Sequence, residues 1–280
     1  MKGLNFQESS WDHDFGMLPT LLSALHKHQP RCRLSVSLPT RIDLISALSQ
    51  LANSSCLYSL DIAIHDGQHL ACGELFRIGP ACPNLRTLKI LSSKFTAPDK
   101  CLYLAPPEEG DAVMRLDSLE LDGPIFYHGE QEYDCTKQET SLFAFLDPSS
   151  LRRLSLTHPG HLLDFLSTSM NLRYLSLDAA MSWVSDCNNS GNALLPSIFS
   201  SQRLEELYLT GCINVLTIDS MKALRGTLRC LKIHENEDEF AICKRRVFSD
   251  QEIQNLGETF PTLEYLSLDV NYDGQWVCYQ

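Results

Sequence analysis

Closely spaced histidines are the first candidates for chemistry in this chain. The pairs are His65 with His69, His158 with His161, and His26 with His28. Histidines three or four residues apart on a helix can bind one metal ion, as in the H-E-x-x-H pattern. The first two pairs, however, follow segments predicted to be strands, and neither has that pattern. The third pair lies at the end of a predicted helix, where positive charge suits the helix dipole.

Other catalytic patterns are missing from the sequence. G-x-S-x-G, G-x-x-x-x-G-K-[S/T] and G-x-G-x-x-G do not occur, and the many carboxylates cannot be paired in a common pocket from sequence alone. We therefore predict that the chain is not an enzyme and holds neither a cofactor nor a metal. A metal-dependent or hydrolytic enzyme that uses the histidine turns remains the alternative from another functional class.

The overall charge argues against nucleic acid as a partner. The 280 residues carry 23 Lys and Arg against 35 Asp and Glu, a net charge of −12. Phosphate binding needs clustered basic side chains. The one dense basic run, Lys244 to Arg246, follows an acidic run at residues 235–239, which is typical of a solvated loop.

The spacing of the cysteines and the length of the apolar segments indicate the cellular compartment of the protein. The 11 cysteines are widely spaced and include no C-x-x-C, so we interpret most of them as reduced, buried side chains. No apolar run approaches the roughly 18 residues of a membrane span. Residues 1–11 have no apolar leader segment. These features predict an intracellular protein, cytoplasmic or nuclear, with no membrane partner.

A repeated sequence pattern predicts the strands that would position the residues of a functional site. The pattern L-x-x-L-x-[L/I] occurs in eight copies, which begin at Leu57, Leu85, Leu116, Leu151, Leu172, Leu204, Leu228 and Leu263. A ninth, degenerate copy is RCRLSV, residues 31–36. In a strand, residues two apart share a face, so the second and third apolar positions of each copy point inward. One strand buries too little alone, so neighbouring copies must stack around a shared core.

Segments between the copies have helical spacing. Leu18 to His28 is amphipathic, and Arg41 to Asn53 has apolar residues at Ile42, Ile45, Leu48 and Leu51. Shorter segments of this kind are residues 162–170, 193–199 and 218–224. Ser249 to Glu252 predicts a capping box at the start of a helix that ends near Phe260. Two irregular inserts, residues 96–111 and 123–140, are predicted to be loops. Strands that alternate with helices predict an α/β fold with a parallel sheet.

Residues that alternate with the buried leucines must line the opposite face of the sheet. This face is broad enough for a protein or peptide partner. Tyrosines are favoured as binding anchors, and Arg153 occupies the position that matches Tyr174 one repeat later. Packing among these side chains is the competing interpretation. The predicted partner-binding residues are Asp61, Lys89, Glu120, Arg153, Tyr174, Glu206, Tyr208, Lys232 and Tyr265.

The repeat resembles that of the leucine-rich-repeat family. The fuller pattern L-x-x-L-x-L-x-x-[N/C] is met by Leu204 to Cys212 and Leu263 to Asn271, and with isoleucine in the third slot by Leu228 to Asn236. The resemblance covers roughly residues 31–270. It implies a curved solenoid, with a parallel sheet on the concave face and helices and loops on the convex face. We expect residues 1–30 to form a helical N-terminal cap and residues 31–280 to form about eight to nine irregular repeats.

A narrower resemblance is to the repeat portion of fungal F-box/leucine-rich-repeat proteins. It rests on LLSALHKHQPRCRLSVSLP before the first clear copy, and on CPNLRTLKI and FPTLEYLSL. It implies substrate recognition for an F-box-type ubiquitin ligase, with a protein held on the concave face. An F-box is not visible here, so a Skp-type adaptor is expected only if the full gene product contains one. A free-standing repeat scaffold without a ubiquitin link is the alternative.

Overall fold

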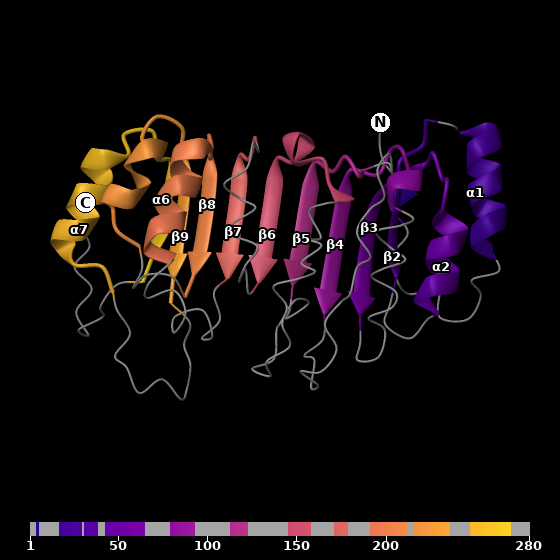
Figure 1. Cartoon of the computed structure of the whole chain (residues 1–280), viewed down its shortest axis with the longest axis horizontal. Coiled ribbons are helices and arrows are strands. Elements are labelled where there is room, and N and C mark those ends of the chain that lie inside the picture. The colour runs from indigo at the N-terminus through magenta and orange to yellow at the C-terminus, as the bar shows by residue number, and fades with distance from the viewer. Residues whose placement is uncertain are drawn as a thin grey trace, which may run out of the picture. The chain divides into compact units, whose positions relative to one another are not determined.

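A computed structural model of the chain is shown in Figure 1. It describes residues 4–5, 17–29, 31–38, 43–64, 79–92, 113–122, 145–157, 171–178, 191–211, 216–235 and 247–269. The described strands are β1 (Leu4–Asn5), β2 (Leu34–Leu38), β3 (Leu57–Ile64), β4 (Thr87–Ser92), β5 (Ser118–Asp122), β6 (Arg153–Thr157), β7 (Tyr174–Asp178), β8 (Glu206–Thr210), β9 (Cys230–His234) and β10 (Tyr265–Leu268). The described helices are α1 (Met17–His28), α2 (Leu44–Leu51), α6 (Gly191–Ser201) and α7 (Asp250–Thr259), with 3-10 turns η2 (Gly79–Ala81), η5 (Pro148–Ser150) and η6 (Asp219–Leu224).

The described strands pair in the order in which they occur in the sequence. The pairing of β1 through β5, and that of β7 through β10, is parallel throughout. Described helices or 3-10 turns lie between most successive strands, so the predicted α/β class with a parallel sheet is confirmed. The chain divides into two compact units, residues 1–155 and residues 156–280, and each is described by itself.

In the first unit, the repeated apolar positions form columns across the strands. Leu60 pairs with Leu88, which pairs with Leu119, and all three are at most 2% exposed. The third apolar positions form a second buried column of Ile62, Ile90 and Leu121. Stacking of equivalent residues therefore supplies the core that a single strand lacks, as the repeat predicts. Each buried side chain of this size contributes about 1.5–3 kcal/mol before entropy is subtracted.

The buried face of helix α2 differs from the face that its apolar spacing predicts. Leu44, Ala47, Leu48 and Leu51 are buried, whereas Ile45 is 42% exposed. Because 3.6 residues make one turn, the stripe through residue 44 excludes residue 45, which lies about 100° around the helix. Asp43 caps the helix by accepting a hydrogen bond from the Ser46 backbone N–H at 3.2 Å.

The degenerate ninth copy does form a strand, but in a different frame from the predicted one. A register shift between Leu34 and Ser35 places Val36 opposite Leu60 and Leu38 opposite Ile62. The repeat frame is thus displaced by two residues from RCRLSV. Strand β1, which pairs with β2, was not foreseen within the segment expected to be a helical cap.

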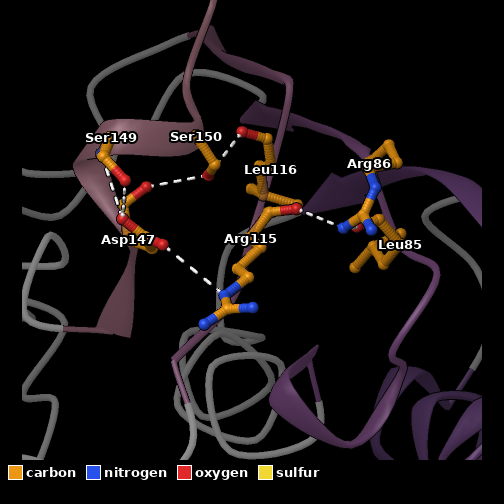
Figure 2. Close-up of polar contacts among 7 residues, drawn as sticks. All are labelled: Leu85, Arg86, Arg115, Leu116, Asp147, Ser149 and Ser150. Carbon is orange, nitrogen blue, oxygen red and sulfur yellow. Dashed lines mark hydrogen bonds and ion pairs between the residues drawn. The ribbon is translucent and has the colours of Figure 1, made fainter. Parts of the chain in front are cut away.

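Polar side chains connect the turns that precede β4, β5 and β6, as Figure 2 shows. Arg86 donates to the carbonyl of Arg115 at 2.7 Å, and Arg115 forms an ion pair with Asp147 at 3.5 Å. Asp147 caps η5 by accepting a hydrogen bond from the Ser149 backbone N–H, and Ser150 donates to the carbonyl of Leu116 at 3.0 Å. The bonds from Arg86 and Ser150 satisfy backbone carbonyl groups, and Asp147 satisfies the Ser149 backbone N–H.

The second unit repeats the same columns. Leu175, Leu207 and Leu231 pair in register and are fully buried. The next residue in the column, Leu266 of β10, is 39% exposed. Ser249 and Glu252 form the predicted capping box at the start of α7. The segment at residues 218–224 is a 3-10 turn, η6, rather than a short α-helix.

Several sequence predictions fall outside the described residues. These are the two inserts at residues 96–111 and 123–140, the predicted helix at residues 162–170, and the histidine pairs at residues 65 and 69 and at residues 158 and 161. No described helix combines the length and the apolar composition that spanning a bilayer requires.

Candidate functional site

In the first unit, the predicted site residues lie side by side on the sheet face opposite the buried leucines, which we call the polar face. Strand pairing places Asp61 opposite Lys89 and Lys89 opposite Glu120. The Lys89 ammonium and the Glu120 carboxylate form an ion pair at 2.5 Å, with both side chains about one-third exposed. Alternation along each strand therefore turns the charges toward solvent and the leucines toward the core. Arg153 is exposed at the start of β6.

Asp61 has a raised pKa. Burial is the main cause; the Lys89 charge lowers the pKa, and the Glu120 charge raises it. An acid whose pKa is higher in the folded than in the unfolded chain binds its proton more tightly when folded. This group therefore favours the folded state at acidic pH, and its contribution is lost as the pH rises from the unfolded value, about 3.9, through the raised folded value.

Replacing Asp61 with asparagine should remove this pH-dependent contribution. We expect the melting temperature of Asp61→Asn, relative to the unchanged protein, to increase between about pH 4 and about pH 7. Thermal unfolding at a series of pH values measures this difference. The matched control is Asp117→Asn at an exposed position of the same unit. A melting-temperature difference that stays constant with pH, or that declines toward neutral pH, would contradict the raised pKa of Asp61.

In the second unit, strand pairing aligns the predicted residues in two rows on the polar face. Tyr174 lies opposite Glu206, which lies opposite Cys230. Two residues further along each strand, Tyr208 lies opposite Lys232. The rows are those expected from the sequence, because equal register in successive repeats keeps equivalent residues adjacent.

Four of these side chains form a cluster, which we call the tyrosine cluster: Tyr174, Tyr208, Lys232 and Tyr265. The Tyr174 and Tyr208 rings pack edge to face with centroids 5.0 Å apart. The Lys232 ammonium lies 4.3 Å from the Tyr208 ring centroid and 5.3 Å from that of Tyr265. Tyr265 is 52% exposed. The predicted packing of tyrosines on one another is therefore present, and one ring remains open to a partner.

The Tyr208 hydroxyl is held in its protonated form. Burial raises its pKa, and the neighbouring Cys230 and Glu206 raise it further. The hydroxyl donates to the Glu206 carboxylate at 3.2 Å and accepts a hydrogen bond from the Cys230 thiol at 3.7 Å. The Tyr208 ring is thereby oriented between Tyr174 and Lys232, which makes the cluster a preformed surface.

Three polar residues beyond this cluster were not among the predicted site residues. Ser267 lies 3.2 Å from His234, measured from Oγ to Nε2, and His234 Nδ1 lies 3.1 Å from an Asp269 carboxylate oxygen. The sequence placed all three on the polar face, but their types, taken singly, gave no reason to select them. Their significance depends on contacts between neighbouring strands.

Other candidate sites have less support. A pocket of about 500 Å³ lies between α1 and the end of α2, where His26 and Ser54 approach to 3.5 Å. It contains none of the predicted partner-binding residues. Within the described ranges, no group of three or more His, Cys, Asp or Glu side chains is arranged to hold a metal ion.

The chain matches no protein-family model, no curated protein and no solved structure.

Proposed function

We propose that the chain is a leucine-rich-repeat protein that binds a protein partner through its polar sheet face. The observation that carries this proposal is the alignment of equivalent repeat positions, with leucines stacked on one face and charged and aromatic residues on the other. In the repeat family this face is the concave side of a curved solenoid.

The tyrosine cluster is the proposed centre of the interface. Tyrosine supplies a large contact area and loses little side-chain entropy on binding, because the cluster is already ordered by its own contacts. The exposed Tyr265 ring and the Lys232 ammonium are held beside each other, so a partner can contact both without rearranging them.

A photo-crosslinking experiment tests the location of the interface. A photoreactive amino acid at position 265 should capture a discrete protein partner, identified by mass spectrometry, in cells that express the chain. The control position for the same photoreactive amino acid is Gln251, which is exposed on α7. Helix α7 packs on the core through its buried Leu256. For the captured partner, Tyr174→Ala with Tyr265→Ala should weaken affinity by at least about 30-fold, the loss of about 2 kcal/mol typical of binding anchors. Capture from position 251 instead of 265, or unchanged affinity, would contradict the proposal.

The more specific proposal is substrate recognition for an F-box-type ubiquitin ligase, which rests on the resemblance stated above. It is tested by co-purification of a Skp-type adaptor with the full gene product. Recovery of the adaptor together with the crosslinked partner supports the ligase role. Recovery of the partner without the adaptor favours a free-standing scaffold and leaves the location of the interface intact.

A further inference from the structure

Ser267, His234 and Asp269 form a continuous chain of hydrogen bonds on the polar face of the second unit. Ser267 Oγ lies 3.2 Å from His234 Nε2, and His234 Nδ1 lies 3.1 Å from Asp269 Oδ1. The second carboxylate oxygen, Asp269 Oδ2, accepts a hydrogen bond from the Glu235 backbone N–H at 2.6 Å. The carboxylate is therefore held on both sides.

The carboxylate fixes which histidine nitrogen carries the proton. A carboxylate can only accept hydrogen bonds, so His234 Nδ1 donates to the ionised form of Asp269. In the neutral imidazole, Nε2 is then the unprotonated nitrogen, and the Ser267 hydroxyl donates to its lone pair. The Asp269 side chain is 11% exposed and His234 is 42% exposed, so the base is accessible while its orienting group is covered.

The sheet register produces this geometry. Ser267 pairs with Lys232, and Leu268 pairs with Ile233. His234 is therefore the diagonal neighbour of Ser267 on the same face, a spacing that a histidine side chain can cross. Asp269 follows β10 immediately, and its carboxylate contacts His234 Nδ1 at the end of β9.

We infer that Ser267 is an activated nucleophile that accepts acyl groups from carboxylic esters. Its Oγ attacks the carbonyl carbon while His234 Nε2 takes the hydroxyl proton, and the carbonyl electron pair moves to oxygen. Collapse of this intermediate breaks the bond to the leaving alcohol, which receives the proton from His234. Water then attacks the acyl-serine by the same route, so ester and water give acid and alcohol. His234 is the general base, and Asp269 is a positioning residue for its ring.

The surroundings define the ester class. The backbone N–H groups of β9 are committed to pairing with β8 and β10, so they are not available to an oxyanion. The positive charge nearest in register is the Lys232 ammonium, opposite Ser267. A single cation on an open face stabilises an oxyanion less than a closed site does. The substrates are therefore small esters with good leaving groups.

This inference goes beyond the proposed binding role and beyond the prediction of a non-catalytic chain. The absence of G-x-S-x-G does not oppose it, because that pattern describes a serine on a strand-to-helix turn, whereas Ser267 lies inside a strand. Such a constellation is recognised by geometry rather than by order in the sequence. Acylation can fail while partner crosslinking at position 265 succeeds, so the two proposals are tested separately.

The experiment uses p-nitrophenyl acetate and a fluorophosphonate on the intact chain, followed by peptide mapping. With the phosphonate, the Ser267 Oγ–phosphorus bond forms, fluoride leaves, and the proton goes to His234. We expect Ser267 to be labelled at least about 100-fold faster than Ser176, the serine in the matching central position of β7, since general-base assistance typically contributes this much. This comparison requires no variant and so does not depend on any variant folding.

Variants then assign the roles. His234→Ala should lower the Ser267 labelling rate about 100-fold with each reagent, and added imidazole should restore part of it. Asp269→Asn should lower the rate and remove the Nδ1–H signal of His234 in nitrogen NMR. Equal labelling of Ser267 and Ser176, or a Ser267 rate that is insensitive to His234→Ala, would overturn the inference.

Discussion

Leu207→Ala will lower the free energy of unfolding of the second unit by about 2–5 kcal/mol. Leu207 is fully buried between Leu175 and Leu231, which occupy the equivalent positions of the neighbouring strands. Truncation removes apolar contacts and leaves a cavity that strands on both sides keep open. Urea unfolding followed by circular dichroism measures the loss.

Leu266→Ala is the matched control for this prediction. Leu266 has the same position in its repeat but is 39% exposed, so truncation removes less buried surface and leaves no enclosed cavity. We expect a loss of about 1–2 kcal/mol, in proportion to the smaller buried area and without a cavity contribution. Similar losses for the two variants would mean that the strands do not stack in the register described.

Gly79→Ala will lower the free energy of unfolding of the first unit by about 1–3 kcal/mol. A Cβ atom on Gly79 would collide with Met114 Sδ and lie only 3.0 Å from its Cγ. Met114 is 2% exposed, so its Sδ atom can move away only by displacing other buried atoms. Thermal or urea unfolding detects the resulting overpacking.

Two further variants separate overpacking from a general effect of alanine. In α7, nothing lies within 4 Å of a Cβ added to Gly257, so Gly257→Ala should stabilise the chain by up to about 1 kcal/mol through helix propensity. Combining Gly79→Ala with Met114→Ala should cost less than the sum of the single losses, by about 0.5–3 kcal/mol. Strict additivity would show that the methyl group added at position 79 does not interact with the Met114 side chain.

The repeated leucines explain why so much of the sheet was predictable. A period of two within each copy, together with the recurrence of the copies, determined the strands, their buried residues and the rows of the polar face. Lys89 beside Glu120 and Tyr208 beside Lys232 follow from that alignment. The frame of β2 was missed because a local register shift leaves no periodic signal.

Contacts within the rows were less predictable. The sequence placed Tyr174, Tyr208 and Tyr265 on one face, but it did not indicate that the Lys232 ammonium lies against two of their rings. Such contacts depend on the rotamers that neighbouring side chains permit. Helix α2 shows the same limit, because which stripe of an apolar helix is buried depends on what packs against it.

The sequence by itself determined an α/β chain of stacked strands with an apolar face and a polar face, since alternation along a strand is a local property. Only the tertiary structure decided that Ser267, His234 and Asp269 meet, because their hydrogen bonds cross between β9 and β10 and depend on register to within one residue. It also decided that Leu266 is partly exposed while Leu231 is buried, because burial depends on what covers a residue, and a sequence pattern specifies only the residue itself.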